Sequence, residues 1–115
     1  MKDDVATLSQ ILERIERIES SGVDRERFLH DAWDQDALIR NLEIIGEAAK
    51  RLSEATRRRT RGIRWSDIAG LRDVAIHGYD QLNLPRIWSV VEKDLPELKK
   101  AVRRLLKSPT RSGPR

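Results

Sequence analysis

The chain has 115 residues and no cysteine, which suits one domain with a real hydrophobic core and excludes disulfide bonds and thiolate chemistry. Charged residues make up 37% of it and the formal net charge is +4. Residues 1–56 carry 8 Lys and Arg against 13 Asp and Glu, whereas residues 57–115 carry 15 against 6. This separation is typical of a protein that binds a polyanion or an acidic partner, or that pairs with a second copy through unlike halves.

In the first half of the chain, apolar residues at three- and four-residue spacing predict an amphipathic helix over about residues 3–20. Gly22 is suited to a left-handed C-cap at its end. Asp24 can cap a short helix over about residues 25–31. A long helix is predicted to follow, over about residues 35–58.

Glycine, serine and proline residues indicate a helix contact and helix boundaries in the rest of the chain. Gly46 lies inside the long helix, where it costs about 1 kcal/mol against alanine, so it predicts the close approach of another helix. Ser66 can cap a helix over about residues 67–76. A last helix is expected to begin near Pro85 and to kink or restart at Pro96.

The pattern shows no period-2 strands, and it predicts an all-α fold: an up-and-down bundle of four to five helices. The bundle is expected to occupy residues 1–107. A basic, disordered tail is expected over residues 108–115, which are small, polar and rich in Pro and Gly. Trp33, Trp65 and Trp88 are interpreted as core or dimer-interface residues.

A motif of the form Arg-x4-His-x-Tyr, made by Arg72, His77 and Tyr79, stands near the middle of the chain. Arg72 is permanently cationic and can hold a phosphate, and histidine has an unperturbed pKa close to neutrality. A fixed cation beside a proton-transfer group suits phosphodiester chemistry without a metal. The alternative is structural: an arginine and histidine on a solvated face, or a histidine at a helix end.

Helix geometry limits how these side chains meet. Asp73 and His77 are four residues apart and share a face, so Asp73 can orient the imidazole. Arg72 and His77 are about 140° apart on a regular helix and do not converge. Either Gly78 lets the helix end unwind, or two subunits each supply residues to one cleft.

A run of basic residues lies upstream of the motif. Its members are Arg57, Arg58, Arg59, Arg61 and Arg64. One interpretation is a basic patch that binds the phosphate backbone of RNA without sequence preference. The other is a solvated basic turn favoured by the helix dipole.

Several kinds of site are not predicted. His30 and His77 form no ligand cluster with acidic pairs at a recognisable spacing, so neither a metal nor a cofactor is expected. No apolar run approaches the length of a membrane span, and the amino terminus is acidic rather than signal-like. These features predict a cytoplasmic protein with no membrane partner.

Three segments, in this order and spacing, resemble the HepT-like branch of the HEPN superfamily. They are residues 41–53, the motif segment 71–79, and residues 82–88 followed by 94–98. The branch contains the toxins of type VII toxin–antitoxin pairs whose antitoxin is a minimal nucleotidyltransferase of the MntA type. The resemblance extends from the first helix to about Leu106. It implies a HEPN-like dimer with paired motifs facing one another, or a larger hetero-oligomer with the antitoxin.

The implied reaction is RNA cleavage without a metal. His77 would move the 2′-hydroxyl or leaving-group proton, and Arg72 would hold the phosphate. Tyr79 would be the residue that the antitoxin adenylylates to silence the toxin. The alternative for Tyr79 is structural: a half-buried ring with its hydroxyl at the edge of the bundle. Many relatives carry asparagine after the motif arginine and an aromatic residue after the tyrosine, where this chain has Asp73 and Asp80.

Two other functions remain open from the sequence. One is a non-catalytic HEPN module that binds a partner or a nucleotide through the same motif. The other is a small basic nucleic-acid-binding bundle without chemistry, against which the lack of a helix-turn-helix spacing weighs.

Overall fold

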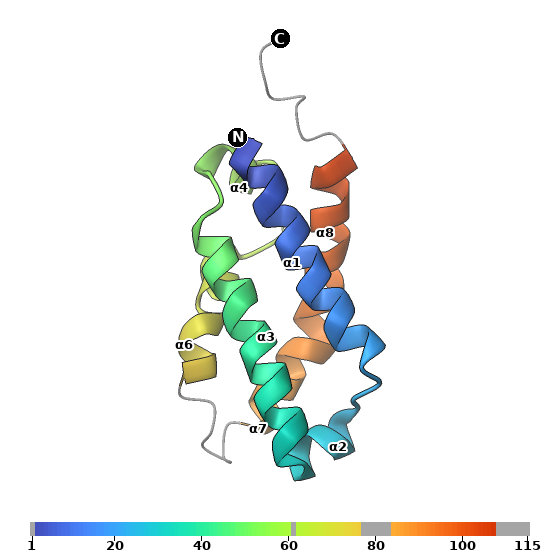
Figure 1. Cartoon of the computed structure of the whole chain (residues 1–115). Helices are drawn as coiled ribbons and strands as arrows, with labels where there is room; N and C mark the ends of the chain where they lie inside the picture. The colour runs from blue at the N-terminus through green and yellow to red at the C-terminus, as the bar shows by residue number, and fades with distance from the viewer. Residues whose placement is uncertain (1, 61, 77–83, 108–115) are drawn as a thin grey trace.

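The structure is a computed structural model, and it describes residues 2–60, 62–76 and 84–107. Every regular element in these ranges is a helix, which confirms the predicted all-α class (Figure 1). None of the helices described is long and apolar enough to cross a lipid bilayer. The tail over residues 108–115 lies outside the described residues, so its predicted disorder stays a prediction.

The long helices α1 (Lys2–Ser20), α3 (Ala32–Lys50) and α8 (Leu95–Lys107) form the frame of the molecule. The chain descends in α1, rises in α3, descends again through α5 and α6, and rises through α7 into α8 (Figure 1). α1 packs against both α3 and α8, while α5 and α6 pack on α3. The arrangement is the expected up-and-down bundle.

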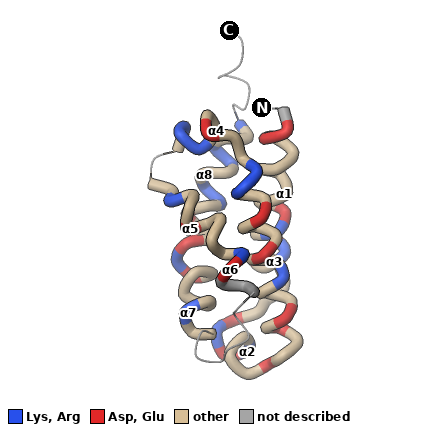
Figure 2. The backbone as a smooth tube through the Cα atoms, turned by 90° about the vertical axis from the view of Figure 1, so that its left-hand side faces the viewer, with Lys and Arg blue, Asp and Glu red and all other residues tan. Residues whose placement is uncertain are grey.

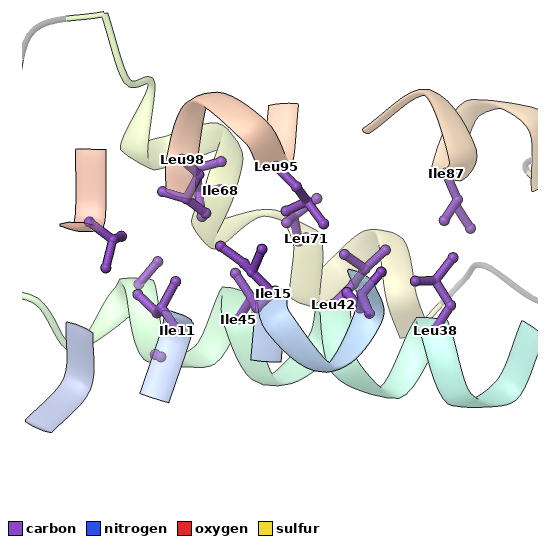
Figure 3. Close-up of a cluster of buried hydrophobic side chains, with 14 of the residues drawn as sticks. Ile11, Ile15, Leu38, Leu42, Ile45, Ile68, Leu71, Ile87, Leu95 and Leu98 are labelled. Carbon is purple, nitrogen blue, oxygen red and sulfur yellow. The ribbon is translucent and has the colours of Figure 1, made fainter. Parts of the chain in front are cut away.

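The core is a contiguous cluster of apolar side chains between these helices (Figure 3). Its centre includes Ile11 and Ile15 from α1, Leu42 and Ile45 from α3, and Leu98 from α8, each at most 1% exposed. Aliphatic side chains of this size contribute about 1.5–3 kcal/mol each when fully buried. Burial of the apolar helix faces is therefore the main stabilising term of the bundle.

Helix ends in the first half follow the predicted capping chemistry. Gly22 has a φ of 75°, the left-handed conformation expected after α1. Asp24 caps α2 (Arg25–His30): its carboxylate accepts a hydrogen bond from the Arg27 amide at 2.9 Å. Asp31 caps α3 in the same way. The predicted roles of Gly22 and Asp24 are confirmed, whereas the cap at Asp31 was not predicted.

The single helix predicted over residues 35–58 is wrong. The structure has two helices there, α3 and α4 (Glu54–Arg58), separated by a turn. Leu52 turns into the core, where it is 3% exposed, and the Ser53 side chain caps the first turn of α4. Burial of one side chain and capping by the next together end α3 at Lys50, a break that helix periodicity alone does not predict.

The helix predicted over residues 67–76 begins earlier and is divided in two. α5 (Trp65–Ala69) starts at a buried tryptophan, so Ser66 lies inside the helix and the predicted cap is wrong. A one-residue turn separates α5 from α6 (Leu71–Ile76), which carries the start of the motif.

The last helix contains an irregular turn before Pro96. α7 (Leu84–Ser89) continues into a π-helical segment, Val90–Asp94, and then into α8. The Leu95 amide bonds to the Val90 carbonyl, five residues back. Proline lacks an amide hydrogen and is tolerated in the first turn of a helix. The predicted kink or restart therefore takes the form of a widened helical turn ahead of Pro96.

The three tryptophans have different environments. Trp65 is buried and donates from its indole to the Thr60 hydroxyl at 2.9 Å. Trp88 is buried and stacks on Phe28, with ring centroids 5.9 Å apart. These two are core residues, as predicted. Trp33 is 82% exposed near the start of α3, so the core interpretation is wrong for it and the dimer-interface interpretation stays a prediction.

Candidate active site

The structure describes the first part of the motif. Arg72 and Asp73 lie on α6, which packs on α3 (Figure 1). His77 and Tyr79 lie outside the described residues, and so does Asp80. The geometry available for the site is therefore that of Arg72 and its surroundings.

The backbone of α6 touches α3 at Gly46. A Cβ atom on Gly46 would lie 2.6 Å from the Arg72 nitrogen and 3.1 Å from the Ala69 carbonyl oxygen. Real side chains do not tolerate the shorter distance, so only glycine fits here without a shift. The close helix approach predicted from Gly46 is confirmed, and the partner is the helix that carries the motif arginine.

The Arg72 guanidinium is paired with a carboxylate of α3. Its Nε contacts Glu47 Oε2, and its Nη1 lies 3.6 Å from Asp73 Oδ1. The Arg72 side chain is 39% exposed, so solvent and a ligand can still reach it. The motif cation is held between two acids, one from α3 and one from its own helix.

Glu47 is a site residue that the sequence analysis did not single out. The sequence did contain an indication of this role. Glu47 directly follows Gly46, so a helix that packs closely on Gly46 also lies near the Glu47 side chain. Asp73 was expected to orient His77. In the structure its carboxylate is 76% exposed and lies near Arg72, and its relation to His77 is outside the described residues.

Arg57, the first residue of the basic run, is used inside the fold. Its Nη2 donates to the carbonyl oxygens of Ala49 at 3.3 Å and Lys50 at 3.1 Å. These carbonyls belong to the last turn of α3, where a cation is favoured by unpaired acceptors and by the helix dipole. Arg57 therefore has a structural role at the α3–α4 junction.

Arg58 and Arg64 of the run lie on the surface, whereas Arg59 is partly buried. Arg58 pairs with Glu54 at 3.3 Å and Arg64 pairs with Asp67 at 3.1 Å, and both side chains are at least three-quarters exposed. Such exposed pairs contribute little stability, about 0–1 kcal/mol, and can be exchanged for a phosphate contact. Figure 2 shows basic residues at the α4 end of the molecule. Arg61 lies outside the described residues.

A surface cleft of about 600 Å³ opens next to the start of α6, between α5 and the π-helical segment. Arg64 and Arg86 line it together with Asp67, Asp94 and Glu97. Its charge is mixed, so it does not form a continuous basic track for a nucleic acid. Within the part of the chain that the structure describes, no group of three or more His, Asp or Glu side chains is placed to hold a metal ion.

Relatives of this chain are described mainly as ribonucleases. A putative RNase of Caldanaerobacter subterraneus subsp. tengcongensis is 41% identical over 92 residues, which is 80% of each chain. A probable ribonuclease HepT of Thermococcus cleftensis is 39% identical over 102 residues, covering 87% of this chain and 93% of the relative. A gamma-glutamylcyclotransferase and putative RNase of Methanocaldococcus jannaschii is 39% identical over 107 residues.

The last match covers 91% of this chain but only 48% of the Methanocaldococcus protein, so the chain spans about half the length of that relative. No solved structure gave a significant match. The family model described as Ribonuclease HepT-like matches residues 11–105. That span includes the contact between Gly46, Glu47 and Arg72 as well as the whole motif. The chain therefore belongs to the HepT-like ribonuclease family.

Proposed function

We propose that this protein is a metal-independent endoribonuclease, the toxin of a type VII toxin–antitoxin system that acts in the cytoplasm. The observation that carries the proposal is the placement of Arg72 in a chain of the HepT-like ribonuclease family. Its helix is seated on Gly46, its guanidinium remains accessible, and His77 follows five residues later in the sequence.

In this mechanism the 2′-oxygen of RNA attacks the neighbouring phosphorus and the bond to the 5′-oxygen breaks. His77 takes the 2′-hydroxyl proton or gives a proton to the leaving 5′-oxygen. Arg72 binds the phosphate and stabilises the charge that develops on its oxygens. Because the nucleophile is the 2′-hydroxyl, the enzyme cleaves RNA and leaves DNA intact.

Purified protein is expected to cleave mixed RNA in the presence of a chelator and to leave DNA of the same sequence uncut. The His77→Ala variant, prepared in parallel, should lose at least about 100-fold in rate, since proton transfer contributes 10²–10⁴-fold in such reactions. Gel analysis of the products over time measures both rates. Equal cleavage by the two preparations would identify a contaminant and contradict the catalytic role of His77.

The non-catalytic alternative has one observation in its favour. Two carboxylates, those of Glu47 and Asp73, lie beside Arg72 and compete with a phosphate for the guanidinium. A module that only binds a nucleotide or a partner would bind RNA or AMP in the chelator assay without cutting RNA. That result would replace the nuclease by the alternative.

We further propose that the protein acts as a homodimer, alone or within a larger complex with the antitoxin. Support comes from the uneven charge of its two halves and from Trp33, a large apolar side chain left 82% exposed. A second subunit would also supply the convergence that Arg72 and His77 lack on one regular helix. The exposed arginines Arg58 and Arg64, with Arg59 beside them, are proposed to contact RNA phosphates.

Control by an MntA-like nucleotidyltransferase is proposed to act at Tyr79, the only tyrosine of the chain. An attached AMP would bring a bulky anion two residues from His77 and close to the phosphate-binding cation. Co-expressed wild type should gain AMP on Tyr79 by mass spectrometry, whereas Tyr79→Phe should stay active and escape enzymatic neutralisation. AMP found on serine or threonine, or on no residue, would contradict the assignment.

A further inference from the structure

The contact between α3 and α6 fixes both the backbone and the side chain of Arg72. Gly46 determines how closely the Arg72 backbone approaches α3, because a Cβ there would lie 2.6 Å from the Arg72 nitrogen. Glu47, the next residue of α3, contacts the Arg72 side chain at Nε. Two consecutive residues of one helix therefore set both the position of the motif arginine and the direction of its side chain.

The point of contact on the guanidinium decides what remains for a ligand. Arginine carries five N–H donors in a planar fork, and Nε supplies one of them. The contact with Glu47 is made at Nε, and Nη1 lies 3.6 Å from Asp73. Nη1 and Nη2 can together bind a phosphate end-on, so an acid at Nε leaves this bidentate face of the fork usable.

We propose that Glu47 is a positioning residue for RNA cleavage: by holding Arg72 at Nε, it keeps the terminal nitrogens directed at the scissile phosphate. The role rests on the proposed nuclease function. A free arginine side chain would sample many rotamers, and misplacement by about 1 Å can cost up to about 100-fold in rate. A carboxylate partner restricts that motion before the substrate arrives.

The charge of Glu47 has a second consequence, which separates positioning from simple binding. A carboxylate next to Arg72 weakens the attraction of the guanidinium for a phosphate. Loss of that charge should leave RNA binding unchanged or slightly tighter, while the less fixed guanidinium stabilises the transition state less well. A positioning role thus predicts a fall in kcat with no rise in KM.

The variant Glu47→Gln keeps the length and shape of the side chain and removes its charge. We expect its kcat for RNA cleavage in chelator to fall about tenfold, with KM equal to or below that of wild type. The control is Glu13→Gln on α1, which makes the same change in net charge at an exposed residue paired with Arg17 at 3.6 Å. It should match wild type in both constants.

Two results would overturn the positioning role. An unchanged kcat would show that Arg72 needs no help from Glu47. A raised kcat/KM without loss of kcat would show that Glu47 only competes with the substrate. Thermal unfolding of each variant is compared with wild type, so that a fall in kcat caused by partial unfolding is recognised.

A measurement without RNA tests the contact itself. The Nε–H resonance of Arg72, assigned by its absence in Arg72→Lys, should shift in Glu47→Gln and stay in place in Glu13→Gln. No shift in a protein that cleaves RNA would overturn the positioning role alone. A shift in a protein whose wild type leaves RNA uncut would overturn the proposed nuclease, and the role of Glu47 in it, while the contact stands.

Discussion

Replacing Asp4 by asparagine is expected to lower the free energy of unfolding by about 2 kcal/mol near neutral pH. Asp4 lies in the first turn of α1 and is 5% exposed. Its carboxylate accepts hydrogen bonds from the Ser53 amide at 3.1 Å, the Ser53 hydroxyl at 2.5 Å and the Thr56 hydroxyl at 2.6 Å. The variant keeps the shape but presents an amide N–H₂ where an oxygen accepted two hydroxyls, so the tie between α1 and α4 weakens.

The effect should depend on pH only in the acid range. Burial by itself raises the pKa of Asp4, but the hydrogen bonds from Ser53 and Thr56 together hold this pKa below its ordinary value. A lowered pKa in the folded state gives stability that is complete above the unfolded value, about 3.9, and that is lost as the pH falls through the folded value. The difference between wild type and variant should therefore be constant above about pH 5 and shrink below about pH 4.

Urea unfolding of wild type, Asp4→Asn and Asp3→Asn across this pH range measures the difference. Asp3 is the adjacent acid on the same turn of α1 and is exposed, so its replacement makes the same change in net charge without removing a buried acceptor. Asp3→Asn should unfold within about 0.5 kcal/mol of wild type. Equal losses for the two variants would show that charge near the helix start matters, and that the buried hydrogen bonds do not.

Asp4 also illustrates why part of the fold could not be predicted. The break between α3 and α4 depends on Ser53, whose partner Asp4 lies 49 residues earlier in the chain. Periodicity and propensity describe neighbours in sequence, and they favoured one continuous helix through this point. The same limit applies to Glu47 and Arg72, which meet only because α6 packs on α3.

What could be predicted depended on short-range chemistry. The caps at Asp24 and Gly22 act within one helical turn, so the residue types alone are sufficient to place them. Gly46 gave a stronger prediction. A glycine inside a helix lowers stability, so its presence indicates that another backbone packs too closely there for a side chain. Its partner was not predictable from the sequence, whereas the close approach itself was.

Replacing Gly46 by alanine is expected to lower the free energy of unfolding by about 2 kcal/mol and RNA cleavage at least tenfold. In an ordinary helix interior this change would stabilise by about 1 kcal/mol. Here the new Cβ would lie 2.6 Å from the Arg72 nitrogen and 3.3 Å from its Cα, and backbone atoms of a packed helix cannot yield as a flexible side chain does. α6 must move away from α3, and Arg72 moves with it.

Gly70→Ala is the matched control, because Gly70 lies two residues before Arg72 in the turn between α5 and α6. Its φ is −68°, and a Cβ there would meet the nearest atoms, the Asp67 and Ser66 carbonyl oxygens, at 3.4 Å. Alanine should fit and stabilise the protein by up to about 1 kcal/mol, because it restricts the unfolded chain.

Urea unfolding and the chelator assay on both variants separate the effects of the two glycines. If Gly46→Ala matched or exceeded Gly70→Ala in stability and activity, the contact at Gly46 would not hold the motif helix in place. If Gly46→Ala alone lost both, the seating of α6 on α3 would be a requirement for the function of Arg72 as well as for the fold.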